Sequence, residues 1–92
     1  MAKATQGVQD LVHEVLAALP KPHSEDITDE VCLAIEKNRK WKAEYDLLSG
    51  QLRYWVVNNW IGQYVSQALG RKRGREVEAT SSLIRYYSKL PP

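Results

Sequence analysis

The sequence predicts an all-α fold, a compact single domain of five to six short helices. Apolar residues recur at helical spacing in several separate stretches, whereas no stretch alternates between turns as a β-hairpin does. The chain has 92 residues, 43% of them hydrophobic and 26% charged, which suits one hydrophobic core and not two. We therefore expect a single helical domain over residues 1–92. It would comprise an amphipathic helix on a proline hinge (residues 1–22) and a helical core (residues 23–92).

The first predicted helix runs from about Thr5 to Leu19. Its apolar residues follow the i, i+3, i+4, i+7 pattern of one buried face, and they are Val8, Leu11, Val12, Val15, Leu16 and Leu19. Pro20 and Pro22 then end the helix and impose an extended link. Because so small a core can rarely spare an apolar stripe, we expect this helix to pack on its own chain. The alternative is exchange between subunits, which would give a homodimer through this helix.

Two further helical segments are predicted between the prolines and Gly50. Thr28 is a candidate N-cap for the first, with acidic residues in the turn that follows. A break near Asn38–Arg39 separates it from the second, although one helix from Asp29 to Leu48 is the alternative. We expect Ser49-Gly50 to end the second segment.

The strongest helical pattern lies in Gln51–Leu69. Its apolar stripe comprises Val57, Trp60, Ile61, Tyr64, Val65, Ala68 and Leu69. Asn58 is a good N-cap, so a turn inside the sequence VVNN is an alternative to one long helix. Gly70 supplies a stop, and a last helix is expected from about Ser81 with Thr80 as its cap.

Composition and charge restrict the function classes. The net charge is +2, but residues 1–50 carry 6 basic and 9 acidic side chains, whereas residues 51–92 carry 7 and 2. A basic half of this kind can face a polyanion. Cys32 is the only cysteine, so no intrachain disulfide forms, and neither a secretory signal nor an apolar run of about 20 residues is visible. We expect a cytoplasmic protein that does not bind a membrane.

Catalytic chemistry has little support in the sequence. His13 and His23 stand on either side of the prolines without a Cys or carboxylate at metal-ligand spacing. Cys32 lies in an apolar context, where a buried hydrophobe is favoured over a nucleophile. No phosphate-binding or nucleophile motif is present. We therefore predict a protein that is not an enzyme, without cofactor or metal.

Nucleic-acid binding is favoured by an uncharged helix face beside a basic cluster. Arg71, Lys72, Arg73 and Arg75 would contact phosphates. The apolar stripe leaves Asn59, Gln63 and Gln67 together on the polar face, and amide side chains pair with base edges. The first hypothesis is a DNA-binding transcription regulator, with RNA as a variant. A helix-turn-helix-like unit would use Asn58–Leu69 as its recognition helix, preceded by the segment before Ser49 or by Gln51–Val57.

The alternative is a non-enzymatic protein–protein interaction module, an adaptor or inhibitor. The uncharged face would then be covered by a partner, because charged residues are depleted at interface cores. Tyr54, Trp55, Tyr86 and Tyr87 do not all fit inside so small a core, and Tyr54 and Tyr86 fall off the apolar stripes. Such residues would be exposed anchors, and tyrosines beside arginines also suit stacking on single-stranded bases.

Overall fold

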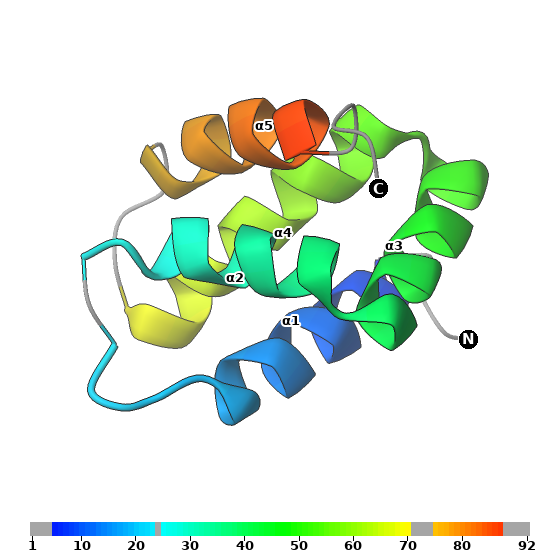
Figure 1. Cartoon of the computed structure of the whole chain (residues 1–92). Coiled ribbons are helices and arrows are strands. Elements are labelled where there is room, and N and C mark those ends of the chain that lie inside the picture. Colours follow the sequence, from blue (N-terminus) through cyan, green and yellow to red (C-terminus); the bar gives the residue numbers. More distant parts are fainter. Residues whose placement is uncertain (1–4, 24, 71–74, 88–92) are drawn as a thin grey trace.

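The computed structural model describes residues 5–23, 25–70 and 75–87 (Figure 1). These ranges form helices without any strand, which confirms the predicted all-α class. The helices in chain order are α1 (Gln6–Ala18), α2 (Ile27–Lys37), α3 (Arg39–Leu52), α4 (Tyr54–Leu69) and α5 (Arg75–Tyr87). None of them combines the length and apolarity needed to cross a bilayer.

Helix α4 is the central element of the fold, because it packs against α5, α3 and α1. Figure 1 shows α5 and α1 on opposite sides of the globule, with α2 and α4 between them. One hydrophobic core joins the helices, and its fully buried members come from α1, α2, α4 and α5. They include Val12, Ile35, Ile61, Val65 and Ile84.

Helix α1 packs on its own chain, as expected. Val8, Val12 and Val15 are fully buried, and Leu11 and Leu16 are nearly so. The stripe is therefore already used within the chain, and a homodimer through α1 remains an untested prediction.

The break between α2 and α3 lies at Asn38, as predicted. Asn38 has extended backbone angles, and its Oδ1 accepts a hydrogen bond of 3.0 Å from the backbone N–H of Trp41. Asn38 therefore caps α3. The expected cap at Thr28 is wrong, because α2 begins at Ile27 and Thr28 is buried within its first turn.

The predicted boundary between α3 and α4 was wrong, and one of the two alternatives for α4 is excluded. Ser49-Gly50 does not end α3, which continues to Leu52, and the chain changes direction at Arg53 instead. No turn interrupts VVNN, since Tyr54–Leu69 is one helix. Asn58 does not cap a helix. It is buried, and its Oδ1 accepts a hydrogen bond of 2.6 Å from the Tyr45 hydroxyl.

Gly70 ends α4 as predicted, in a left-handed conformation with φ of 68° that glycine adopts without strain. The last helix starts earlier than expected, at Arg75, with Glu76 and Glu78 in its first turn. Acidic side chains are favourable there because they face the positive end of the helix dipole. Thr80 is therefore not a cap. Its buried hydroxyl donates to the Glu76 carbonyl at 2.7 Å, as threonine does inside helices.

Candidate functional site

Much of the uncharged face of α4 belongs to the core. Asn58, Gly62 and Ser66 recur at i, i+4 and i+8, and all are buried. A Cβ added to Gly62 would lie 2.5 Å from the Val77 Cα and 2.7 Å from the Glu76 carbonyl oxygen. Helix α5 can therefore approach α4 so closely only because residue 62 is glycine. Charged residues are absent from this line of α4 because it is covered by the same chain.

The predicted base-contacting residues lie beside this buried line. Asn59 and Gln63 are half-buried, and Gln67 is exposed on the last turn of α4. A recognition helix needs one free face to enter the major groove, whereas α4 is packed by α1, α3 and α5. The helix-turn-helix-like unit is therefore not confirmed.

The predicted phosphate contacts fall almost entirely outside the described part of the chain. Arg71, Lys72 and Arg73 lie outside the described residues. Arg75 is the first residue of α5, and its side chain also lies outside them. The structure therefore leaves the relation between these cations and the amides untested.

A group of exposed residues stands where α3 meets α4, at an outer corner of the globule (Figure 1). We call Leu47, Arg53, Tyr54 and Trp55 the corner cluster. Within the described ranges, the exposed large hydrophobic residues are Leu47 at 59%, Trp55 at 51% and Tyr54 at 36%. The expectation that Tyr54 is exposed is confirmed, and Trp55 beside it is exposed too, whereas a role as an anchor stays a prediction. Tyr86 and Tyr87 cannot be compared, because their side chains lie outside the described part.

The corner cluster has a defined geometry. The rings of Tyr54 and Trp55 meet edge to face, with centroids 5.1 Å apart and an interplanar angle of 87°. The guanidinium carbon of Arg53 lies 5.4 Å from the centroid of the Trp55 ring. A guanidinium held over a ring can still donate its N–H groups to a carboxylate or phosphate. Among the described residues, no carboxylate forms an ion pair with Arg53.

The backbone of Arg53 is strained. Its φ of 74° and ψ of 144° lie close to a region that is essentially restricted to glycine. Such a conformation costs about 1–3 kcal/mol and is found most often at functional sites. The sequence carries no signal for this feature, because an arginine gives no indication of positive φ.

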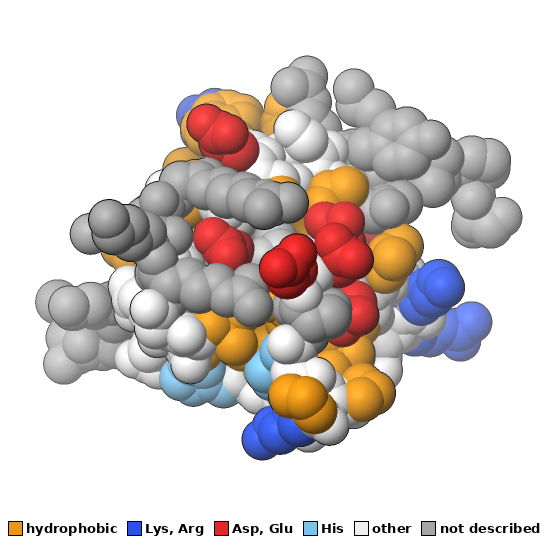
Figure 2. All heavy atoms as spheres, turned by 90° about the vertical axis from the view of Figure 1, so that its left-hand side faces the viewer, with side chains coloured by type: hydrophobic (Ala, Val, Ile, Leu, Met, Phe, Trp, Pro, Cys, Tyr) orange, Lys and Arg blue, Asp and Glu red, His pale blue; other side chains and the backbone are white. Residues whose placement is uncertain are grey.

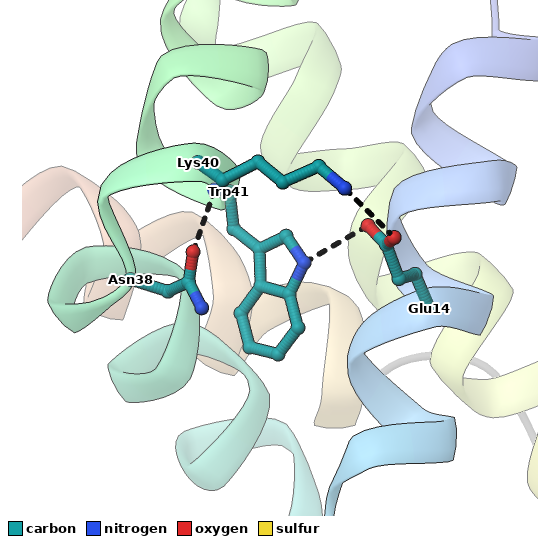
Figure 3. Close-up of polar contacts among 4 residues, drawn as sticks. All are labelled: Glu14, Asn38, Lys40 and Trp41. Atoms are coloured by element: carbon teal, nitrogen blue, oxygen red, sulfur yellow. Dashed lines mark hydrogen bonds and ion pairs between the residues drawn. The ribbon is translucent and has the colours of Figure 1, made fainter.

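Trp41, by contrast, has a structural role. Its indole Nε1 donates to Glu14 Oε2 at 2.9 Å, and Lys40 Nζ lies 3.4 Å from Glu14 Oε1 (Figure 3). Both oxygens of this α1 carboxylate thus contact α3. The hydrogen bonds fix the polar edge of Trp41 while its ring packs on the core.

Of the residues considered for catalysis, His13 and His23 line one hollow, whereas Cys32 is buried in the core. Cys32 is fully buried, and burial, reinforced by the nearby Asp29 carboxylate, raises the pKa of its thiol well above the ordinary range. Its thiolate is therefore disfavoured at neutral pH. Across the described residues, no group of three or more His, Cys, Asp or Glu side chains is placed to hold a metal ion.

Comparison of the chain with protein-family models, with curated proteins and with solved structures finds no match. The candidate site therefore rests on the side chains of the corner cluster and of α4.

Proposed function

We propose that this chain is a non-enzymatic protein-interaction module that docks on a protein partner through the corner cluster. The observation that carries the proposal is Trp55, a half-exposed tryptophan with Arg53 stacked on its ring. Tryptophan, tyrosine and arginine are the residues most enriched at the energetic centres of protein interfaces. Exposed Leu47, on the preceding helix, extends the apolar surface that a partner would cover.

The cluster favours a partner that presents a carboxylate beside aliphatic or aromatic side chains. The Trp55 and Tyr54 rings offer apolar area, and their edge-to-face contact holds them with little conformational freedom. The guanidinium of Arg53 can donate two hydrogen bonds to a carboxylate while it stays over the Trp55 ring. The corner cluster thus presents a positive charge and apolar area on the same surface.

The strained backbone of Arg53 supports the same proposal. A glycine at residue 53 would remove the steric conflict, so stability alone favours glycine at this position. An arginine at this position is understandable if its side chain serves binding. Arg53 is also the single residue between α3 and α4, so its backbone angles form the junction of the two helices.

Photo-crosslinking in host cells tests this proposal. A photoreactive phenylalanine analogue replaces Leu47 in one variant and Ala18, an exposed residue of α1, in a matched control. We expect a discrete crosslinked protein from residue 47 and not from residue 18. Adding Arg53→Glu, which reverses the charge, should abolish the product. A product obtained equally from both positions, or one that survives Arg53→Glu, would contradict docking through this cluster.

Self-association is a separate outcome of the same surface. Sedimentation of the purified chain gives its association state, and crosslinking between two differently tagged copies identifies contact between them. A product containing only this chain would replace the foreign partner by a second copy.

A DNA-binding regulatory function is the second proposal, and one observation favours it. Gln67 is exposed on the last turn of α4, immediately before Gly70 and the basic segment that follows. In this proposal Asn59, Gln63 and Gln67 contact base edges, and the phosphate contacts come from Arg71, Lys72, Arg73 and Arg75. RNA is the related alternative, because Tyr54 and Trp55 beside Arg53 also suit base stacking.

Fluorescence anisotropy of duplex and single-stranded oligonucleotides across a salt series tests this second proposal. Each phosphate contact on duplex DNA should contribute a log–log salt slope of about −0.9. Replacing Arg71, Lys72 and Arg73 by alanine should flatten the slope, whereas Gln67→Ala should change sequence preference and leave the slope unchanged. Absence of binding at low salt would exclude the DNA function.

A further inference from the structure

A hollow of about 250 Å³ lies where the C-terminal ends of α1 and α4 meet the link between α1 and α2. Its apolar wall includes Leu16 from α1 and Ala68 and Leu69 from α4. Its polar wall consists of His13, Lys21 and His23. The hollow is smaller than the 300–1,000 Å³ or so of drug-sized pockets, so its ligand would be small.

Among the described residues, the polar wall of the hollow carries nitrogen groups and no carboxylate. Lys21 contributes a positive charge, and each imidazole contributes an N–H donor. Figure 2 shows histidine side chains next to hydrophobic ones on this face, with the Asp and Glu side chains further away across it. An anion at the hollow would therefore meet donors on one side and hydrocarbon on the other.

His23 supplies a second, independent indication. Its Nδ1 is buried and has no hydrogen-bond partner, although the residue as a whole is only half-buried. A proton on Nδ1 would be a buried donor without an acceptor, which is costly. An anionic ligand in the hollow would supply that acceptor.

We propose that this hollow binds a small organic anion, an apolar body bearing a carboxylate or phosphate. The anionic group meets Lys21 and the imidazoles, and the apolar body lies on Leu16, Ala68 and Leu69. The site is separate from the corner cluster, because the 14 residues from Trp55 to Leu69 span about 20 Å along α4. The test of this site is therefore independent of the test of protein docking through the corner cluster.

NMR titration of the purified full-length chain at pH 7 tests the site with four probes. Benzoate and phenyl phosphate carry both features, benzamide lacks the charge, and inorganic phosphate lacks the apolar body. We expect saturable shifts of the Ala68 methyl and histidine ring signals with benzoate or phenyl phosphate. Benzamide and inorganic phosphate should bind at least about fivefold more weakly, because charged hydrogen bonds and apolar burial each contribute.

Three variants assign the binding to the hollow. Lys21→Gln should weaken binding of the better probe at least about fivefold, whereas Lys37→Gln, at the far end of α2, should not. Ala68→Leu fills the hollow from an exposed helical position, so it should abolish binding and leave the thermal unfolding midpoint unchanged. The proposal is overturned if neither organic anion gives saturable shifts, if inorganic phosphate binds as tightly as they do, or if Ala68→Leu still binds.

Discussion

The middle of α4 and its N-terminal corner look alike in sequence and differ sharply in the structure. Both carry uncharged polar or aromatic residues where a helix surface usually has lysine and glutamate. In the middle, Asn58, Gly62 and Ser66 are buried beneath the same chain. At the corner, Tyr54 and Trp55 remain exposed beside the strained Arg53. Absence of charge along a helix therefore does not by itself tell whether its residues are buried within the chain or exposed, and here the structure decides between the two.

The largest expected effect on the free energy of unfolding is at Gly62, where α4 and α5 are in close contact. Gly62→Ala would place a methyl group 2.5 Å from the Val77 Cα, so α5 must move away from α4. We expect a loss of about 3 kcal/mol or more in the free energy of unfolding by urea. Gly50→Ala is the matched control. Nothing lies within 4 Å of its added Cβ, so it should stabilise α3 by about 0.5–1 kcal/mol.

If Gly62→Ala were as stable as the parent chain, α4 and α5 would not be in the contact described. The middle of α4 would then again be available to an external partner.

The buried hydrogen bond between Tyr45 and Asn58 gives the next largest effect. Tyr45→Phe removes the hydroxyl that donates to Asn58 Oδ1 at 2.6 Å and leaves a buried polar group unsatisfied. We expect a loss of about 1–3 kcal/mol in urea unfolding. The double variant Tyr45→Phe with Asn58→Leu should recover part of that loss, because it also removes the Asn58 amide, whose Nδ2 is buried without a partner in the parent chain. Additive losses in the double variant would argue against this coupling.

Arg53→Gly tests the corner cluster, and we expect it to raise the stability of the chain while it weakens binding of the partner. It relieves the positive-φ strain, partly offset by the greater freedom of glycine in the unfolded chain, so stability should rise by about 1 kcal/mol. The same change should reduce the crosslink from residue 47. Arg53→Ala is the control that loses the side chain and keeps the strain. A stability gain without any loss of crosslinking would remove Arg53 from the docking surface.

The smallest effect concerns the pH dependence of the core. Burial raises the pKa of the Cys32 thiol, so the unfolded chain loses that proton first as pH rises. The stability that comes from the protonated thiol is present below its ordinary pKa of about 8.5 and declines above it. The difference in urea midpoint between the parent chain and Cys32→Ala should therefore be smaller at pH 10 than at pH 7. An equal pH dependence in both would contradict the burial of this thiol.

The sequence predicted most of the fold because helix boundaries are encoded locally. The stripe of α1, the break at Asn38 and the stop at Gly70 each depend on residues within a turn or two of the feature. The errors came at residues that often end helices but here lie within them. Ser49-Gly50 lies inside α3, which continues to Leu52, and Thr80 lies inside α5, where its hydroxyl donates to the Glu76 carbonyl.

The candidate site was harder to predict from the sequence than the fold. An apolar stripe shows that one face of α4 is buried, but not that small polar residues pack a second face. Gly62 was the available signal, since a glycine within a long helix costs about 1 kcal/mol and so suggests a close helix contact. Exposure of Tyr54 followed from its position off the stripe. The backbone of Arg53 could not be anticipated, because arginine rarely adopts a positive φ.

The most direct test of the central claim compares Trp55→Ala with Gln67→Ala in the same two assays. If the corner cluster binds a protein, Trp55→Ala should reduce crosslinking from residue 47 about tenfold or more, as loss of a central interface tryptophan does, while Gln67→Ala leaves it unchanged. Neither variant should change the anisotropy of a labelled oligonucleotide, because in this account the chain binds no oligonucleotide. Unchanged crosslinking with Trp55→Ala, together with altered oligonucleotide binding by Gln67→Ala, would contradict the account and favour the nucleic-acid function.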